Sequence, residues 1–143
     1  MSSKKISAKK WIKILKRQGL NPWRAVDLDG TLAFSNANDK WKPTKGMNIG
    51  KPIPKMVKRV KKWLKKGERV KIFTAKYSRI TNCEKLVQKW LIEEAGLPPL
   101  EVTNAKDSEC VEIWDDIAVS VKINKGKKNL RKGNVSKLGN KRI

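Results

Sequence analysis

The sequence predicts an α/β fold, a parallel β-sheet covered by helices on both faces. Three short apolar runs are typical of buried strands, at residues 24–29, 69–74 and 100–103. Helical patterns separate them, and strands that alternate with helices pair in parallel because each helix returns the chain to the same end of the sheet. The length of 143 residues allows about one domain.

Two helices are predicted from apolar residues at helical spacing. The first is short and basic, ends near Gly19, and has as its apolar face Ile6, Trp11, Ile12 and Leu15. The second covers residues 53–66 with Pro54 in its first turn, and its apolar face carries Ile53, Met56, Val57, Val60, Trp63 and Leu64. Its other face is either a track for a phosphate backbone or a solvated surface, and carries Lys55, Lys58, Arg59, Lys61, Lys62, Lys65 and Lys66.

A third helix is predicted from a capping box. Thr81 and Glu84 have the spacing that satisfies the first backbone N–H groups of a helix, which would run to Gly96. Its buried stripe would be Cys83, Leu86, Val87, Trp90 and Leu91. Two further short strands are predicted at residues 111–114 and 117–123.

The composition narrows the chemistry. The chain has 35 Lys and Arg, 13 Asp and Glu and no His, a net charge of +22 that attracts phosphate-rich partners. Without His, every Ser-His or Cys-His nucleophile and every His-bound zinc or haem is excluded, and two cysteines are too few for a structural zinc site. Any metal must therefore be bound by oxygen atoms.

The charge also indicates the domain organisation. Residues 1–17 carry seven basic groups and residues 122–143 carry nine, and neither stretch has an acid. We therefore expect a basic segment at 1–20 that contains the first helix, a folded domain at 21–123 and a flexible basic tail at 124–143. The basic ends either contact nucleic acid or only keep the protein soluble. No apolar stretch is long enough for a signal peptide or a membrane span, so we expect a cytoplasmic protein.

Four acids follow predicted strands, at the edge of the sheet where parallel strands present their carboxyl ends. They are Asp27, Asp29, Asp115 and Asp116. Carboxylates gathered without a counter-charge repel, and Mg²⁺ is the divalent cation that most often binds a few carboxylates together with a substrate phosphate. Thr74 ends another strand with a hydroxyl, and Lys106 follows the next strand with a positive charge suited to phosphate.

Each of these features has a simpler reading. Asp-x-Asp-Gly can be an ordinary turn. It also begins like a calcium loop, but the twelfth position from Asp27 is Asn38 instead of a bidentate Glu. Thr74 alone would be a strand end, Lys106 a surface lysine, and the Asp115/Asp116 pair a charged loop. Their order and shared placement at strand ends favour a single site.

Together these segments resemble the four motifs of the haloacid dehalogenase-like (HAD) phosphohydrolases: VDLDGTL at 26–32, IFTA at 72–75, Lys106, and IWDD at 113–116. The resemblance implies a three-layer Rossmann-like fold and an Mg²⁺-dependent phosphatase. Asp27 would be the nucleophile and Asp29 the general acid and base. Phosphate would be bound by Gly30, Thr74, Ala75 and Lys106, and Mg²⁺ by Asp27, the backbone carbonyl of Asp29, and the Asp115/Asp116 pair.

The chemistry suits these residue types. A carboxylate attacks phosphorus once cations neutralise the phosphate oxygens, and water then cleaves the aspartyl-phosphate. Contact with the metal should keep Asp27 ionised, while Asp29 exchanges protons with the leaving oxygen and with water.

Short insertions indicate that the fold has no cap domain and that its site is open. Residues 32–52 leave room only for a flap, in which Trp41 either stacks a terminal base or packs onto the domain. Contacts to nucleic acid are expected from Lys40, Trp41, Lys42 and Lys76.

The sequence therefore predicts a phosphatase that acts on a phosphorylated nucleic-acid end, such as a polynucleotide 3′-phosphate, or on a nucleotide. Two alternatives stay open. One is a phosphatase of the same fold for a small molecule or a phosphoprotein. The other is a nucleic-acid-binding protein that has kept the scaffold and lost turnover.

Overall fold

The computed structural model describes residues 6–35 and 48–129. Residues 7–116 belong to one compact unit, and the segment from Ile117 onward belongs to a second. The first helix is therefore part of the same unit as the sheet. No helix in the described residues is long and apolar enough to cross a membrane.

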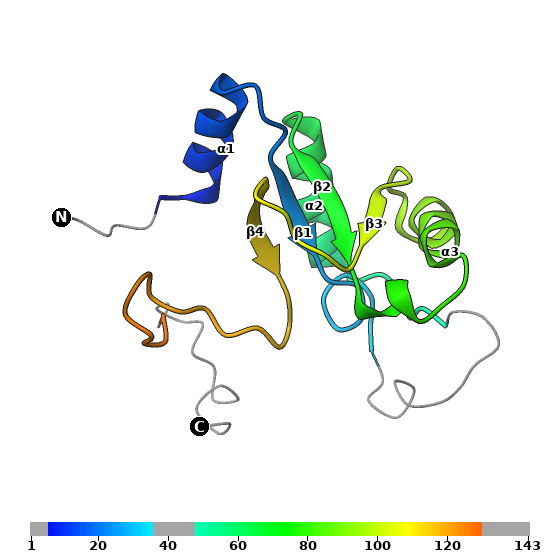
Figure 1. Ribbon diagram of the computed structural model, residues 1–143. Coiled ribbons are helices and arrows are strands. Elements are labelled where there is room, and N and C mark those ends of the chain that lie inside the picture. The colour runs from blue at the N-terminus through cyan, green and yellow to red at the C-terminus, as the bar shows by residue number, and fades with distance from the viewer. Residues whose placement is uncertain (1–5, 36–47, 130–143) are drawn as a thin grey trace. The chain divides into compact units, whose positions relative to one another are not determined.

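Four parallel strands form the sheet of the first unit. They are β1 (Trp23–Val26), β2 (Arg69–Phe73), β3 (Glu101–Thr103) and β4 (Cys110–Trp114), in the spatial order β3-β2-β1-β4 (Figure 1). The predicted parallel sheet is confirmed, since β1 pairs in parallel with β2 and β4, and β2 with β3. All four carboxyl ends consequently lie at one edge.

The three predicted helices form close to their expected bounds. They are α1 (Ala8–Arg17), α2 (Pro54–Lys65) and α3 (Cys83–Trp90), and a π-helical turn η3 (Leu91–Ala95) continues α3. Gly96 ends this last helix with a positive φ of 66°, which glycine adopts without strain. In α1 the buried residues are Ile12 and Leu15, while Trp11 is exposed.

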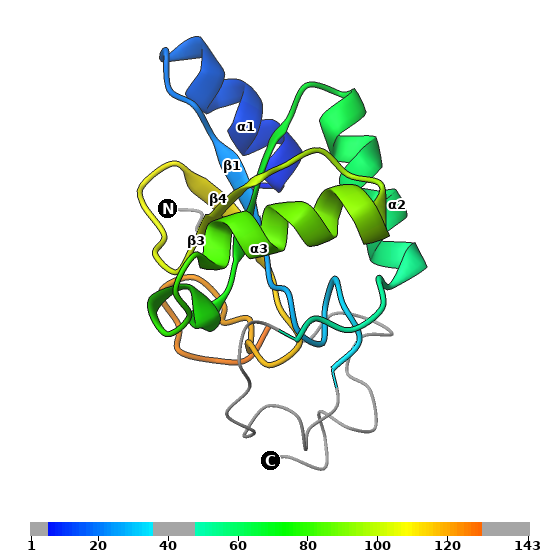
Figure 2. The same ribbon diagram turned by 90° about the vertical axis from the view of Figure 1, so that its right-hand side faces the viewer.

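The main core lies between the sheet and the two helices α2 and α3. Figure 2 shows α3 in front of the sheet with α2 to its right. One continuous cluster contains side chains of the three strands β1, β2 and β3 and of both helices, including Val26, Ile72, Val60, Val87 and Leu91. Burial of this apolar surface is the main force that holds the strands in place.

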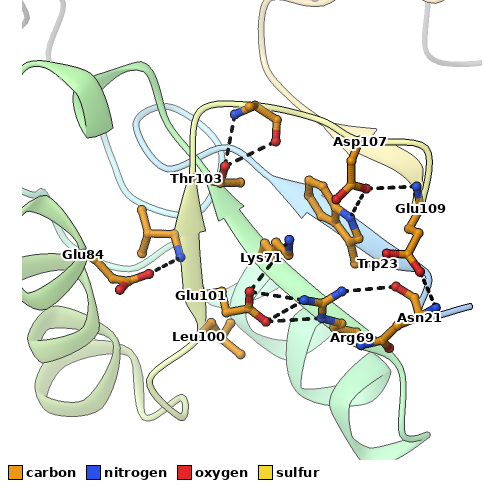
Figure 3. A network of polar contacts seen from close by, with 12 residues as sticks. Asn21, Trp23, Arg69, Lys71, Glu84, Leu100, Glu101, Thr103, Asp107 and Glu109 are labelled. Atoms are coloured by element: carbon orange, nitrogen blue, oxygen red, sulfur yellow. Dashed lines mark hydrogen bonds and ion pairs between the residues drawn. The ribbon is translucent and has the colours of Figure 1, made fainter.

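On the opposite face of the sheet a loop crosses the strands, and α1 packs against β4 with Ile12 and Leu15 buried outside the main core cluster. Residues 104–109 join β3 at one edge to β4 at the other, and the Trp23 indole Nε1 donates to Asp107 Oδ1 at 2.8 Å beneath this loop (Figure 3). Arg69 and Lys71 on the same face pair with Glu101. Only six residues separate the two strands, too few for a helical crossover.

A buried arginine of β1, Arg24, makes ion pairs with two acids. Arg24 donates to both carboxylate oxygens of Glu68, at 2.7 and 2.6 Å, and to Glu112 on β4 at 3.0 Å. Its guanidinium also lies 4.6 Å from the centre of the Trp63 ring. A buried charge is tolerated only when it is paired in this way. The network fixes β4 beside β1 and with it the residues that follow both strands.

Two local predictions are wrong. The capping box does not form, because the N-cap of α3 is Asn82 and the Glu84 carboxylate instead accepts from the backbone N–H of Val102 at 3.1 Å. The strand predicted at 117–123 is not formed either: within the described part of this segment, only Val121 makes a β-bridge, with Lys128. Alternating apolar residues do not make a strand unless a neighbouring strand accepts their backbone hydrogen bonds.

Candidate active site at the carboxyl ends of the strands

A compact turn of residues 27–33 follows β1. The carbonyl of Leu28 accepts three backbone N–H groups, from Thr31, Leu32 and Ala33 at 3.3, 3.0 and 2.9 Å. Leu28 and Leu32 are fully buried and anchor the turn in the core. Asp27 and Asp29 alternate with these apolar residues, which leaves both carboxylates partly exposed above the sheet.

Three carboxylates meet at this edge, and we call Asp27, Asp115 and Asp116 the carboxylate cluster. One oxygen of each lies within 4.8 Å of the others. The two chain segments are joined by the backbone, since the Asp27 N–H donates to the Trp114 carbonyl at 2.8 Å. The pairing of β1 with β4 therefore creates the cluster from residues almost ninety positions apart in the chain.

The three carboxylates of the cluster act on one another electrostatically. Burial raises the pKa of Asp27 to about 7, and a hydrogen bond with Asp116 and the charges of Asp115 and Asp116 add to the effect. Without a cation, these effects favour the neutral form of Asp27, and its ionisation in contact with a metal stays a prediction. A divalent cation with oxygen ligands fits this donor set, because it would remove the repulsion that raises this pKa.

The metal-free protein should lose stability as the pH rises from about 4 through about 7. The pKa of Asp27 is higher in the folded chain than its ordinary value of 3.8, so the folded protein binds this proton more tightly than the unfolded chain does. The stabilising contribution is complete below pH 4 and disappears above pH 7. In EDTA at pH 8, Asp27→Asn should therefore exceed the wild type in unfolding free energy by about 0.5–2 kcal/mol.

Thermal melts of the wild type and Asp27→Asn from pH 4 to pH 8 measure the contribution of the Asp27 carboxyl, since the two proteins share all other ionisable groups. The difference in Tm should grow with pH, and millimolar Mg²⁺ should narrow it at pH 8. A difference that is independent of pH would contradict this assignment of charge to the cluster.

Gly30 is required by the close approach of the cluster. Its φ is +87°, and a Cβ at this position would lie 2.6 Å from Asp116 Oδ2. A side chain at this position would strain the backbone and would require the Asp116 carboxylate to move. Gly30 was expected to contact phosphate, and in the structure its neighbour is Asp116.

Asp29 and Thr74 come together through a short 3₁₀ helix, η2 (Ala75–Ser78), that follows β2. Lys76 Nζ lies 2.9 Å from Asp29 Oδ2, with both side chains about five-sixths buried. Thr74 is buried, and its hydroxyl accepts from the Lys76 backbone N–H at 3.3 Å. The motif after β2 therefore lies beside the motif after β1, as the parallel sheet requires.

The structure does not bring the remaining predicted residues into contact with these groups, or they lie outside the described residues. Ala75 is exposed at the start of η2. Lys106 is exposed on the loop before β4. Its charge acts on Cys110 at the start of β4, where burial raises the pKa of the thiol and Lys106 opposes that rise. Lys40, Trp41 and Lys42 fall within 36–47, outside the described residues.

Sequence reasoning missed two contacts. The Thr31 hydroxyl donates to Asp27 Oδ2 at 3.4 Å, and Lys76, which is expected to contact nucleic acid, pairs with Asp29. The first has a signal in the sequence, since Thr31 belongs to the DGT segment. The second has only a weak signal, because a lysine a few residues after a strand end could point in several directions.

Comparison of the chain with protein-family models, with curated proteins and with solved structures finds no match. The chemistry of this site therefore has to be argued from its residues.

Proposed function

We propose that this protein is an Mg²⁺-dependent phosphatase of the HAD type without a cap domain. The observation that supports it most strongly is the carboxylate cluster, three acids within 4.8 Å at the carboxyl ends of β1 and β4. A parallel sheet binds ligands at this edge. A fourth acid, Asp29, and a hydroxyl, Thr74, lie at the same edge, so the groups that phosphate hydrolysis needs occur together.

Asp27 is the proposed nucleophile. One of its carboxylate oxygens bonds to phosphorus while the bond from phosphorus to the leaving oxygen breaks, and Asp29 gives its proton to that oxygen. In the second step Asp29 takes a proton from water as the water oxygen bonds to phosphorus. The bond from Asp27 to phosphorus then breaks, and inorganic phosphate is released.

The proposed metal ligands are Asp27, Asp115 and Asp116, with the backbone carbonyl of Asp29. A bound Mg²⁺ would supply positive charge against the phosphate oxygens and keep the carboxylate of Asp27 ionised. The proposed phosphate ligands are Thr74 and the two lysines Lys76 and Lys106. Lys76 also lies 2.9 Å from Asp29, and its ammonium group can move from that acid onto the oxygens of an entering phosphate.

A phosphorylated nucleic-acid end or a nucleotide is the proposed substrate, and the most specific proposal is a polynucleotide 3′-phosphate. The net charge of +22 favours an anion larger than a single metabolite. Two aromatic side chains also stand exposed at the site: Phe34, directly after the 27–33 turn, and Tyr77, next to Lys76. Exposed aromatic rings beside a phosphate site suit the stacking of a base.

A substrate panel tests the proposal. With Mg²⁺, the protein should release inorganic phosphate from a 3′-phosphorylated oligonucleotide with a higher kcat/KM than from a 5′-phosphorylated oligonucleotide, a mononucleotide, a sugar phosphate or p-nitrophenyl phosphate. Slow turnover of the last compound and none in EDTA are also expected. Absence of phosphate release from every member of the panel would contradict the phosphatase proposal, and preference for a sugar phosphate would contradict the substrate.

A further inference from the structure

Helix α2 presents a row of lysines to solvent, which we call the α2 stripe: Lys55, Lys58, Lys62 and Lys65. All four are exposed, and their spacing of three, four and three residues puts them on one face of the helix. At a rise of about 1.5 Å per residue the stripe is about 15 Å long. It is therefore a line of regularly spaced positive charges along the surface of the domain.

The charges of the stripe are not neutralised by nearby acids. The chain has no Asp or Glu between Asp39 and Glu68. Within the described parts of the chain, ion pairs are made by four other cations, and none involves a lysine of α2; the cations are Arg24, Arg69, Lys71 and Lys76. Like charges one helical turn apart destabilise a helix, and a bound polyanion would remove this repulsion.

The stripe begins at the candidate active site. The Ile53 N–H donates to the Leu32 carbonyl at 2.8 Å, and Pro52 forms a β-bridge with Ala33, so the turn of residues 27–33 holds the start of α2. From there α2 runs back along the sheet (Figure 2). One turn further on, Arg59 lies 4.7 Å from the ring centre of Trp114, the residue before Asp115. A chain held at the site can therefore continue along α2.

We propose that the α2 stripe binds the backbone of a single-stranded nucleic acid whose terminal phosphate enters the carboxylate site. Successive phosphates offer a repeated negative charge that a row of lysines one turn apart can follow. The position of the terminal phosphate rests on the proposed function, whereas binding of the backbone does not. An anionic membrane fits the stripe less well, because the apolar face of α2 is buried in the core and cannot enter lipid.

Matched double variants test this assignment. Lys58→Gln with Lys62→Gln removes two charges four residues apart from the stripe. Lys85→Gln with Lys89→Gln removes two exposed charges of the same spacing from α3, and serves as the control. Circular dichroism and Tm establish that both variants fold. Binding of a fluorescein-labelled DNA octamer without a terminal phosphate is then measured by anisotropy between 50 and 300 mM KCl.

The α2 variant should bind the octamer about tenfold more weakly or worse at 50 mM KCl, and the slope of log K against log salt should fall by about 1.4. The α3 variant should stay within about twofold of the wild type. Equal losses in both variants, or an α2 variant that binds like the wild type, would overturn the inference. So would an α2 variant that loses binding to phosphatidylserine vesicles and keeps binding to the octamer.

Because the octamer carries no terminal phosphate and nothing is turned over, this result is independent of catalysis. If the wild-type protein binds the octamer through α2 but hydrolyses no phosphomonoester, binding by the α2 stripe is supported and the proposed phosphatase function is contradicted.

Discussion

Asp27→Asn should lower the Mg²⁺-dependent release of phosphate by about 10⁴-fold or more, because it removes the atom that bonds to phosphorus. An amide of the same shape cannot attack, and it also removes one of the three charges that favour a cation in the carboxylate cluster. The measurement is kcat on p-nitrophenyl phosphate and on a 3′-phosphorylated oligonucleotide, at saturating Mg²⁺.

Glu93→Gln is the matched control, since it also replaces one carboxylate by an amide, on the exposed surface of η3. It should retain the activity of the wild type. Binding of the unphosphorylated octamer should be kept by Asp27→Asn, which separates loss of chemistry from loss of folding. If Asp27→Asn and Glu93→Gln turn over at similar rates, Asp27 is not the nucleophile.

Lys76→Ala should cost about 10²–10³-fold in kcat/KM, comparable to the removal of one charge-stabilising group from an active site. Its ammonium lies 2.9 Å from Asp29 and both side chains are about five-sixths buried, so it is well placed to move onto the oxygens of an entering phosphate. Lys106→Ala should cost less, about tenfold or below, because Lys106 is exposed on the loop before β4 and water screens its charge.

Inhibition of p-nitrophenyl phosphate turnover by orthovanadate measures how tightly the site binds a phosphate analogue. It distinguishes a phosphate ligand from a residue that only supports the fold. Lys76→Ala should weaken vanadate inhibition, and Lys76→Arg should restore part of it because the charge is kept. If Lys106→Ala weakens vanadate inhibition more than Lys76→Ala does, Lys106 and not Lys76 is the main phosphate ligand.

The fold could be predicted from the sequence where its signals are local and strong. The apolar face of α2, with Val60 and Trp63 buried, follows directly from helical spacing, and β1 and β2 follow from short apolar runs. The loop that crosses the sheet could not be predicted, because a six-residue connection between β3 and β4 depends on where β4 pairs. Capping of α3 failed for a similar reason, since Glu84 finds a better partner in Val102, a residue of another element.

The candidate site could be predicted in part. Carboxylates that follow parallel strands must share an edge, so the meeting of Asp27 with Asp115 and Asp116 follows from topology alone. The direction of a long side chain does not, and the pairing of Lys76 with Asp29 became visible only with η2 in place. The contact of Gly30 with Asp116 likewise needs the register of β1 against β4.

A crystal structure of the protein with Mg²⁺ and beryllium fluoride tests the central claim most directly. We expect the beryllium to be bonded to a carboxylate oxygen of Asp27, and Mg²⁺ to lie among Asp27, Asp115 and Asp116. A structure in which Asp27 is unmodified and Mg²⁺ is bound at another place would contradict the account.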